Sequence, residues 1–298
     1  MHRLFGFLVA ALSALGVAAP AAVEARPVPL LWQVETADGR THALLGSIHV
    51  MRAEDYPLAP AVEEAFARAG HVVFELDPTE ATSPTTALRL ATAAQAPAGE
   101  DLASLLGSDY ASFERVAAAQ GVPAAALRGM RPWFASLTLA LSAASRAGLE
   151  SSRGVDMVLM QRAREAGKRT SGLERADDQI RALSGAPLRE QLAGLRRVVA
   201  EPARLHEDVL RLHALWRAGD ADGLVAAVAE ELAEQPETYR RINVERNRAW
   251  LPRVEALLRG DDDVLIVVGA LHLVGDDGLV AALRERGWSV TRVVEAEK

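Results

Sequence analysis

Two short segments, one near each end of the chain, share one pattern. They read LLGSIHV at residues 44–50 and VVGALHL at residues 267–273. Each contains two apolar residues, a glycine, a small residue, an aliphatic residue, a histidine and another aliphatic residue. An apolar run typical of a buried strand leads into each segment, and a short helical pattern and a second strand pattern follow it. The sequence therefore predicts two copies of a strand–Gly-x-x-His–helix–strand unit, which requires an α/β fold.

The histidine of each unit is expected at the place where α/β proteins bind ligands. Glycine allows the backbone to leave the strand through torsion angles that other residues avoid. The histidine then lies in the strand-to-helix turn, at the edge formed by the carboxyl ends of the strands. The positive end of the following helix disfavours protonated imidazole. Both rings are therefore expected to be neutral, the form that binds metal or acts as a base.

One histidine at a strand end is more often a hydrogen-bonded structural residue than a ligand. Two histidines in the same context, in a chain that has 7 histidines, favour a shared site instead. We therefore expect His49 and His272 to face one crevice.

The other patterns predict a mixed sheet with a large helical insertion. Apolar runs at residues 30–35 and 42–48 flank an Asp-Gly pair, which predicts a β-hairpin. The run at residues 264–268 is typical of a strand buried on both faces. Further strands are expected at residues 71–77, 168–173 and 288–295, residues 78–100 are expected to form a loop or weak helix, and residues 101–258 are otherwise helical in pattern.

The order of these patterns along the chain predicts a leader segment followed by one domain. Residues 1–25 have a basic start, an apolar run and small residues before a cleavage point after Ala25, as in a secretory signal peptide. The alternative is a retained membrane anchor, although the run is short for a span. Residues 26–298 are expected to form a single domain, with the first unit at 26–77, the helical middle at 78–260 and the second unit at 261–298.

Composition limits the function further. The net charge of −7 gives no basic patch for nucleic acid. No later segment is long and apolar enough to span a membrane. The chain has no cysteine, so disulfides, thiol catalysis and thiolate metal sites are excluded. A periplasmic or secreted protein is expected, and any transition metal in it would need His and carboxylate ligands.

Three acidic residues stand in or beside apolar segments. Glu75 ends the apolar run at residues 72–74, where a carboxylate is costly unless it is paired or bound to metal. A site role and a salt bridge at the sheet rim are both open for Glu75 and for Glu174. Asp156 opens a helical pattern, where it is either a first-turn acid or a site residue.

A helical stripe at residues 243–258 carries one polar exception. Val244, Leu251, Val254 and Leu258 are apolar, whereas Asn247 lies on the same stripe and must find hydrogen-bond partners. Arg246 lies beside it. The pair could contact a substrate or form a structural network, and Pro252 is expected to kink the helix or to start a new one.

These residues resemble the TraB/GumN family, which is related to the Tiki metalloproteases. The resemblance rests on the two Gly-x-x-His segments and, in order between them, on FELD (74–77), GMRPW (129–133), GVD (154–156), GLE (172–174), WRAGD (216–220) and ERNRAW (245–250). It implies a mixed α/β core with a helical middle. The Tiki branch implies peptide cleavage that depends on a divalent metal of the Mn, Co or Zn type. Carried over, His49 and His272 would be metal ligands, Glu75 a ligand or general base, and Arg246 and Asn247 supporting groups.

Three functions remain open at this stage. The first is a hydrolase of a peptide or ester bond in a peptide or small-molecule substrate, in which His49, His272 and a carboxylate (Glu75 first, then Asp156 or Glu174) hold the metal. The second is a metal-free esterase, as the resemblance to erythromycin-esterase-like proteins implies, with His49 as general base oriented by Glu75. The third is a binding protein without catalysis, for haem, a metal or a polysaccharide fragment.

Overall fold

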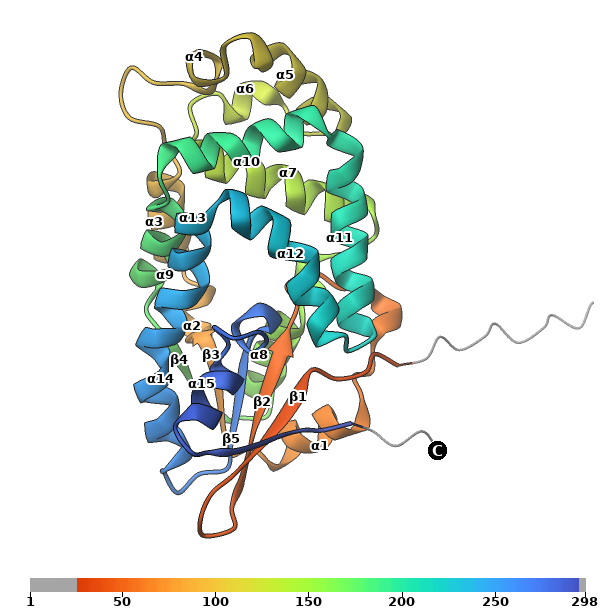
Figure 1. Ribbon diagram of the computed structural model, residues 1–298, viewed down its shortest axis with the longest axis vertical. Coiled ribbons are helices and arrows are strands. Elements are labelled where there is room, and N and C mark those ends of the chain that lie inside the picture. Colours follow the sequence, from red (N-terminus) through yellow and green to blue (C-terminus); the bar gives the residue numbers. More distant parts are fainter. Residues whose placement is uncertain (1–25, 295–298) are drawn as a thin grey trace, which may run out of the picture.

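The computed structural model describes residues 26–294, without the side chains of residues 230–232. The predicted leader, residues 1–25, lies outside the described residues. A β-sheet occupies the lower half of the molecule as drawn, and a layer of helices lies above the carboxyl ends of its central strands (Figure 1). Within residues 26–294, no helix is both long and apolar enough to cross a membrane.

The sheet has six strands in the order β4-β3-β5-β2-β1-β6. Strands β4, β3, β5 and β2 are parallel to one another, whereas β1 pairs antiparallel with β2 and with β6. The strands are β1 (Leu31–Glu35), β2 (Thr41–Ser47), β3 (His71–Leu76), β4 (Arg169–Glu174), β5 (Val264–Gly269) and β6 (Ser289–Arg292). The predicted hairpin is confirmed, and the apolar run of the second unit is β5, which lies between β3 and β2.

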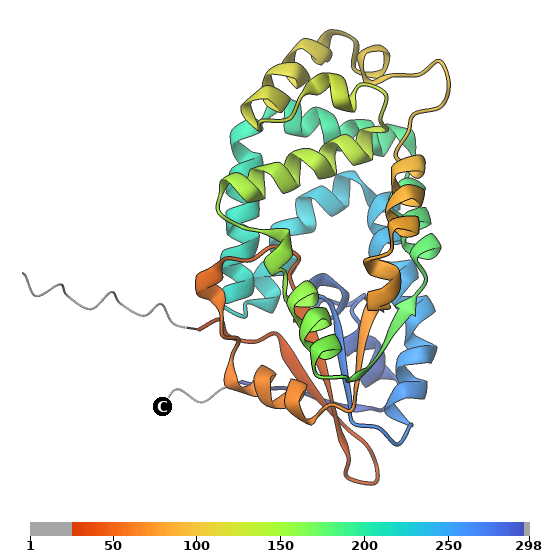
Figure 2. The same cartoon turned by 180° about the vertical axis from the view of Figure 1, so that it is seen from behind.

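Helices cover both faces of the sheet and bury its apolar side chains. Helices α14 (Glu245–Leu258) and α15 (Leu279–Glu285) lie on the side toward the viewer in Figure 1. The opposite side carries α1 (Pro60–Arg68) and α8 (Val155–Glu165), which are in front in Figure 2. Phe74, Leu265 and Ile266 are fully buried between these layers. This burial explains why β5 is apolar without alternation.

The helical insertion has a smaller core of its own. Its buried side chains include Leu102, Phe113, Leu139 and Leu195, each at most 2 % exposed. The helices that form this core are α4 (Leu102–Leu106), α5 (Tyr110–Ala119), α6 (Ala124–Leu127), α7 (Pro132–Arg146) and α10 (Leu188–Ala200). Four further helices connect this layer to the sheet: α9 (Ala176–Ser184), α11 (Pro202–Arg217), α12 (Ala221–Glu234) and α13 (Pro236–Tyr239).

Two expectations about the helices need revision. Residues 78–100 contain α2 (Pro78–Ala81) and a ten-residue helix, α3 (Pro84–Ala93), whose starts are capped by the side chains of Asp77 and Ser83. Pro252 does not start a new helix, because α14 runs through it. Just before α14, residues Arg240–Val244 form a π-helix that leads directly into it.

Candidate functional site

The predicted site residues gather at the carboxyl edge of the four parallel strands. His49 follows β2, and Glu75 lies near the end of β3. Glu174 ends β4, and His272 ends the 3-10 turn Ala270–His272 that follows β5. Because Ser47 pairs with Gly269, the ends of β2 and β5 are level. The parallel arrangement therefore brings together side chains that are distant in sequence.

Gly269 is the point around which three of these side chains converge. A Cβ atom on Gly269 would lie 3.3 Å from Glu75 Oε1, 3.5 Å from His272 Cδ2 and 3.8 Å from His49 Nε2. The backbone N–H of Gly269 donates a hydrogen bond to Glu75 Oε1 at 2.8 Å. Both histidines thus face the same small volume, which the absence of a side chain at Gly269 leaves open.

The reason for the two glycines differs from the one expected. Neither Gly46 nor Gly269 has a positive φ, so no unusual backbone torsion requires them. For Gly46 the reason is packing space instead. A Cβ on Gly46 would lie 3.1 Å from both Leu30 Cβ and Ala270 Cα, so a close approach of packed segments explains this glycine.

His272 is buried and held in one orientation. Its ring Nδ1 lies 2.7 Å from Asn247 Oδ1, and its Nε2 lies 3.0 Å from Arg246 Nη1. Since Arg246 can only donate, Nε2 is the acceptor and Nδ1 carries the proton. Burial, with the guanidinium charge of Arg246, lowers the pKa of His272 to about 4 against the pull of Glu75. The expectation of a neutral ring agrees with this environment.

His49 has a different environment, in which a neighbouring carboxylate opposes the neutral ring that the sequence predicts. Its side chain is 63 % exposed, and its Nδ1 lies 3.1 Å from Asp156 Oδ2. Burial opposes protonation, but the hydrogen bond and charge of Asp156, with the charge of Glu75, raise the pKa of His49 above its ordinary value. Water screens these charges at so exposed a ring. The carboxylate, rather than the end of a helix, therefore determines the charge of His49.

Arg246 links the carboxylates to His272. It is buried, donates to Glu75 Oε2 at 2.6 Å, and donates from Nε and Nη2 to Glu174 at 2.7–3.1 Å. Burial opposes ionisation of Glu75, yet neighbouring rings and Arg246 lower its pKa to about 2. Because His272 is neutral at pH 7, Arg246 is the resident cation that holds Glu75 ionised. Burial raises the pKa of Glu174 in spite of its bonds to Arg246.

Contacts from other elements fix the two turns. Trp216 of α11 donates from Nε1 to the carbonyl of Gly46 at 2.9 Å, and the N–H of Val155 donates to the carbonyl of Ile48 at 3.0 Å. Gly154 packs so closely that a Cβ there would lie 2.6 Å from the carbonyl oxygen of His49. Asn247 donates to the carbonyl oxygens of His272 and Asp277. Asn247 thus positions the second turn as well as the ring of His272.

Three residues of the cluster were not predicted from the sequence. Trp250 donates to Glu174 Oε2 at 3.1 Å, and its ring centroid lies 4.6 Å from that of His272. Asn243 donates to the carbonyl of Leu271 and accepts from Asn247, one helical turn away. Gln179 of α9 donates to Glu75 Oε2 at 3.2 Å. The stripe that contains Asn247 could have indicated Asn243, whereas nothing in the sequence indicates Gln179.

The imidazole and carboxylate groups of this site are suitable ligands for a divalent metal, but the contact between Arg246 and His272 would have to be broken first. His272 Nε2 and Glu75 Oε1 are 3.9 Å apart, which two ligands of one ion can be because each bond is about 2 Å long. Arg246, however, already binds the lone pair of His272 and one oxygen of Glu75. As the side chains stand, residues 26–294 contain no group of three His, Asp or Glu side chains spaced to hold an ion. A metal bound by both histidines and Glu75 would require Arg246 to release His272.

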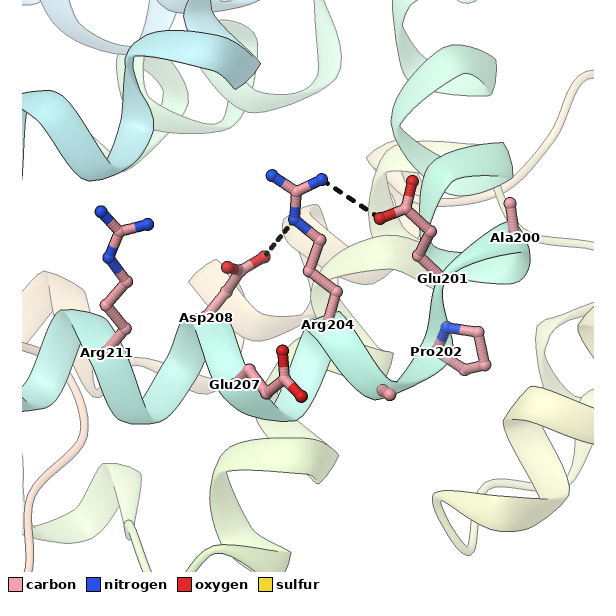
Figure 3. Close-up of a pocket in the computed structure, with 8 residues that line it drawn as sticks. Ala200, Glu201, Pro202, Arg204, Glu207, Asp208 and Arg211 are labelled. Atoms are coloured by element: carbon pink, nitrogen blue, oxygen red, sulfur yellow. Dashed lines mark hydrogen bonds and ion pairs between the residues drawn. The ribbon is translucent and has the colours of Figure 1, made fainter.

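Another surface hollow, of about 630 Å³, lies elsewhere and carries no comparable chemistry. It follows the start of α11, and three of its charged side chains form ion pairs with one another (Figure 3). Arg204 pairs with Glu201 at 3.1 Å and with Asp208 at 3.9 Å along the same helix. The candidate site is therefore the cluster at the edge of the sheet.

The order of the motifs and the residues they bring together agree with one protein family. The sequence pattern of the TraB/PrgY/gumN family matches residues 30–292. This chain belongs to that family. The match extends from just before β1 to the end of β6 and therefore includes both Gly-x-x-His turns.

Curated relatives agree with this assignment. The uncharacterized protein YbaP of Escherichia coli (strain K12) is 24 % identical over 254 residues, which are 84 % of this chain and 90 % of YbaP. YbaP of Shigella flexneri matches to the same extent. The metalloprotease TIKI2 of Danio rerio is 27 % identical, over 83 % of this chain but 57 % of its own length. No solved structure matches the chain significantly.

Proposed function

We propose that this TraB/PrgY/gumN family protein is an exported hydrolase of peptide or ester bonds. The observation that carries the proposal is the convergence of His49 Nε2, Glu75 Oε1 and His272 on the open space beside Gly269. A buried carboxylate, a neutral ring and an exposed ring at the carboxyl edge of a parallel sheet are the groups that hydrolysis of a carbonyl compound requires. The relationship to TIKI2, a metalloprotease, supports the same reaction class.

Each side chain at the site would have its own role in the reaction. His49 is the exposed group, and Asp156 at its Nδ1 leaves Nε2 directed toward the open space, where the ring can take a proton from water once it is itself neutral, at pH values above its raised pKa. Arg246 holds Glu75 ionised and in place. Asn247 keeps the proton of His272 on Nδ1, so that its Nε2 stays an acceptor or ligand atom.

A divalent cation is part of the first form of the proposal. His49 Nε2, His272 Nε2 and Glu75 would hold it once Arg246 releases His272. When bound, it would polarise a carbonyl and lower the pKa of a water molecule.

The second candidate is a metal-free hydrolase, and the contact between His49 and Asp156 favours it. A base oriented by a carboxylate is the arrangement of many acyl hydrolases. The residue that orients His49 would then be Asp156, and not Glu75 as the sequence suggested.

The two forms differ in their response to chelation. Purified protein would be tested on quenched fluorogenic peptides and on p-nitrophenyl esters, with bound metal counted by mass spectrometry. The metal form predicts about one ion per chain, loss of cleavage in EDTA, and recovery with Zn²⁺, Mn²⁺ or Co²⁺. Full activity in EDTA supports the metal-free form. Absence of cleavage under every condition contradicts the proposed function.

Export is proposed from the leader pattern at residues 1–25. Expression of the whole chain in a Gram-negative host, followed by N-terminal sequencing, should give a periplasmic protein that begins at Arg26. A membrane-bound product that still begins at Met1 would contradict export with cleavage.

A further inference from the structure

A cavity of about 490 Å³ adjoins the cluster of site residues, and Glu174, Arg246 and Trp250 belong to its lining. Its other walls come from β4, from α9 and from the π-helix and start of α14. The remaining lining residues are Leu173, Asp178, Arg181, Ala182, Arg241, Glu245 and Ala249. The candidate reacting centre and the cavity thus share three side chains.

The charges that line the cavity are paired, with one exception. Arg246 binds Glu174, Arg181 binds Asp178, and Glu245 binds Arg240 from outside the lining. Arg241 has no carboxylate within 4 Å in the part of the chain that the structure describes. Its Nε is buried and has no hydrogen-bond partner there. A buried donor without a partner is costly, so this guanidinium is suited to a ligand that accepts hydrogen bonds.

The guanidinium of Arg241 lies beside the carboxyl end of α9. Gly185 caps that end, and a Cβ on Gly185 would lie 3.1 Å from Arg241 Nη1. The negative end of a helix stabilises a cation beside it. Leu173, Ala182 and the ring of Trp250 supply the apolar part of the lining. The cavity thus combines an apolar wall with charged side chains, of which Arg241 is the one without a paired carboxylate among the described residues, and such a mixed lining can orient a small polar ligand group.

We propose that this cavity is a substrate subsite in which Arg241 binds a carboxylate group of a peptide. The guanidinium presents parallel N–H groups that match the two oxygens of a carboxylate. The carboxylate is either the C-terminus of the peptide or an Asp or Glu side chain. The choice of a peptide rests on the proposed function, whereas binding of the carboxylate does not require cleavage.

Binding can be measured without turnover in a protein that carries His49→Ala. Three short peptides of equal length would be compared by calorimetry: one with a free C-terminal carboxylate, one with a C-terminal amide, and an amide with one internal Glu. The free carboxylate or the Glu peptide should bind about tenfold more tightly than the plain amide. Whichever of the two is preferred identifies the source of the carboxylate.

Arg241→Gln should abolish this preference. Arg248→Gln is the matched control, because Arg248 is exposed on α14, does not line the cavity, and carries the same charge. The subsite is refuted if carboxylate and amide peptides bind equally, if neither binds at millimolar concentration, or if both variants lose the same affinity. Failure of the proposed function appears separately, as carboxylate-dependent binding without cleavage by the unmodified protein.

Discussion

At the scale of single residues, the two histidines differ although their sequence segments match. His49 is exposed and contacts Asp156, while His272 is buried between Asn247 and Arg246. The register explains the difference, because Gly46 pairs with Val268 and not with Gly269. Residues that match in the two motifs are therefore one position out of register in the sheet. Because successive residues of a strand point to opposite faces, the matching residues point to opposite faces. A shared motif could therefore predict the shared edge but not the separate environments.

Gly269→Ala tests the open space between the site residues. Its φ of −51° and ψ of 137° suit alanine, so the free energy of unfolding should change by less than about 1 kcal/mol. The new methyl group would lie against Glu75 Oε1 and face both histidines, so cleavage should fall by about tenfold or more.

Gly46→Ala is the matched comparison. Its methyl group would press on Leu30 and Ala270, so we expect a loss of about 1–3 kcal/mol in stability, measured by urea unfolding. If Gly269→Ala cleaves at the normal rate, the space beside Gly269 is not where the reaction occurs.

Asn247→Ala tests how the ring of His272 is held. The change removes the acceptor at Nδ1 and the donor to two carbonyl oxygens, and should cost about 1–3 kcal/mol. It should also allow the proton of His272 to move between the ring nitrogens. The ¹⁵N chemical shifts of the ring report this directly. An unchanged single tautomer in the variant would show that Arg246 alone suffices to orient His272.

At the scale of elements, apolar patterns predicted the sheet better than the helices around it. The unbroken run in β5 required a strand covered on both faces, and β5 does lie between β3 and β2. The segment that contains α3 was predicted only as a loop or weak helix, because its sequence is rich in Ala, Thr and Pro. Asp77-Pro78 and Ser83-Pro84 are, however, capping residues followed by proline at the first helical position, and they could have indicated both short helices.

A buried ion network ties the loop after the first turn to α11. Asp55 is fully buried and accepts hydrogen bonds from His213 Nε2 at 2.8 Å, from the N–H of Arg52 at 2.8 Å, and from Arg217. Burial opposes the ionised form, but these bonds outweigh it and lower the pKa of Asp55. Asp55 therefore stabilises the fold at pH values above the pKa of an unfolded aspartate. This contribution disappears as the pH falls through the lower pKa of the folded state.

Asp55→Asn should reduce stability by about 3 kcal/mol at pH 7 and by clearly less near pH 3. Thermal unfolding between these pH values measures the difference. Asp261→Asn is the control, because Asp261 is exposed and should show no such trend. A deficit in Asp55→Asn that is equal at both pH values would contradict the role given to the charge.

At the scale of the whole molecule, the topology explains why scattered motifs meet. Once β2, β3 and β5 are taken as parallel, the sequence places His49, Glu75 and His272 at one edge. The contacts of Arg246 with three elements depend on how α14 lies across β4, which periodicity does not reveal. The lack of a hydrogen-bond partner for Arg241 Nε among residues 26–294 was equally beyond prediction, because it depends on how the residues of α9 lie around Arg241. The segment at residues 129–133 was one of those that indicated the family. It leads into α7, and its Arg131 donates a hydrogen bond to the carbonyl of Ser184.

The central claim is that the cluster around Gly269 is the reacting centre of a hydrolase. Its most direct test is the rate at which the purified protein, His49→Ala and His206→Ala cleave the same fluorogenic substrate. His206 is exposed on α11 and serves as the matched histidine, and unfolding curves would verify that both variants are folded. We predict that His49→Ala loses about 10²–10⁴-fold in rate while His206→Ala keeps the full rate. Equal rates in the folded variants would contradict the account.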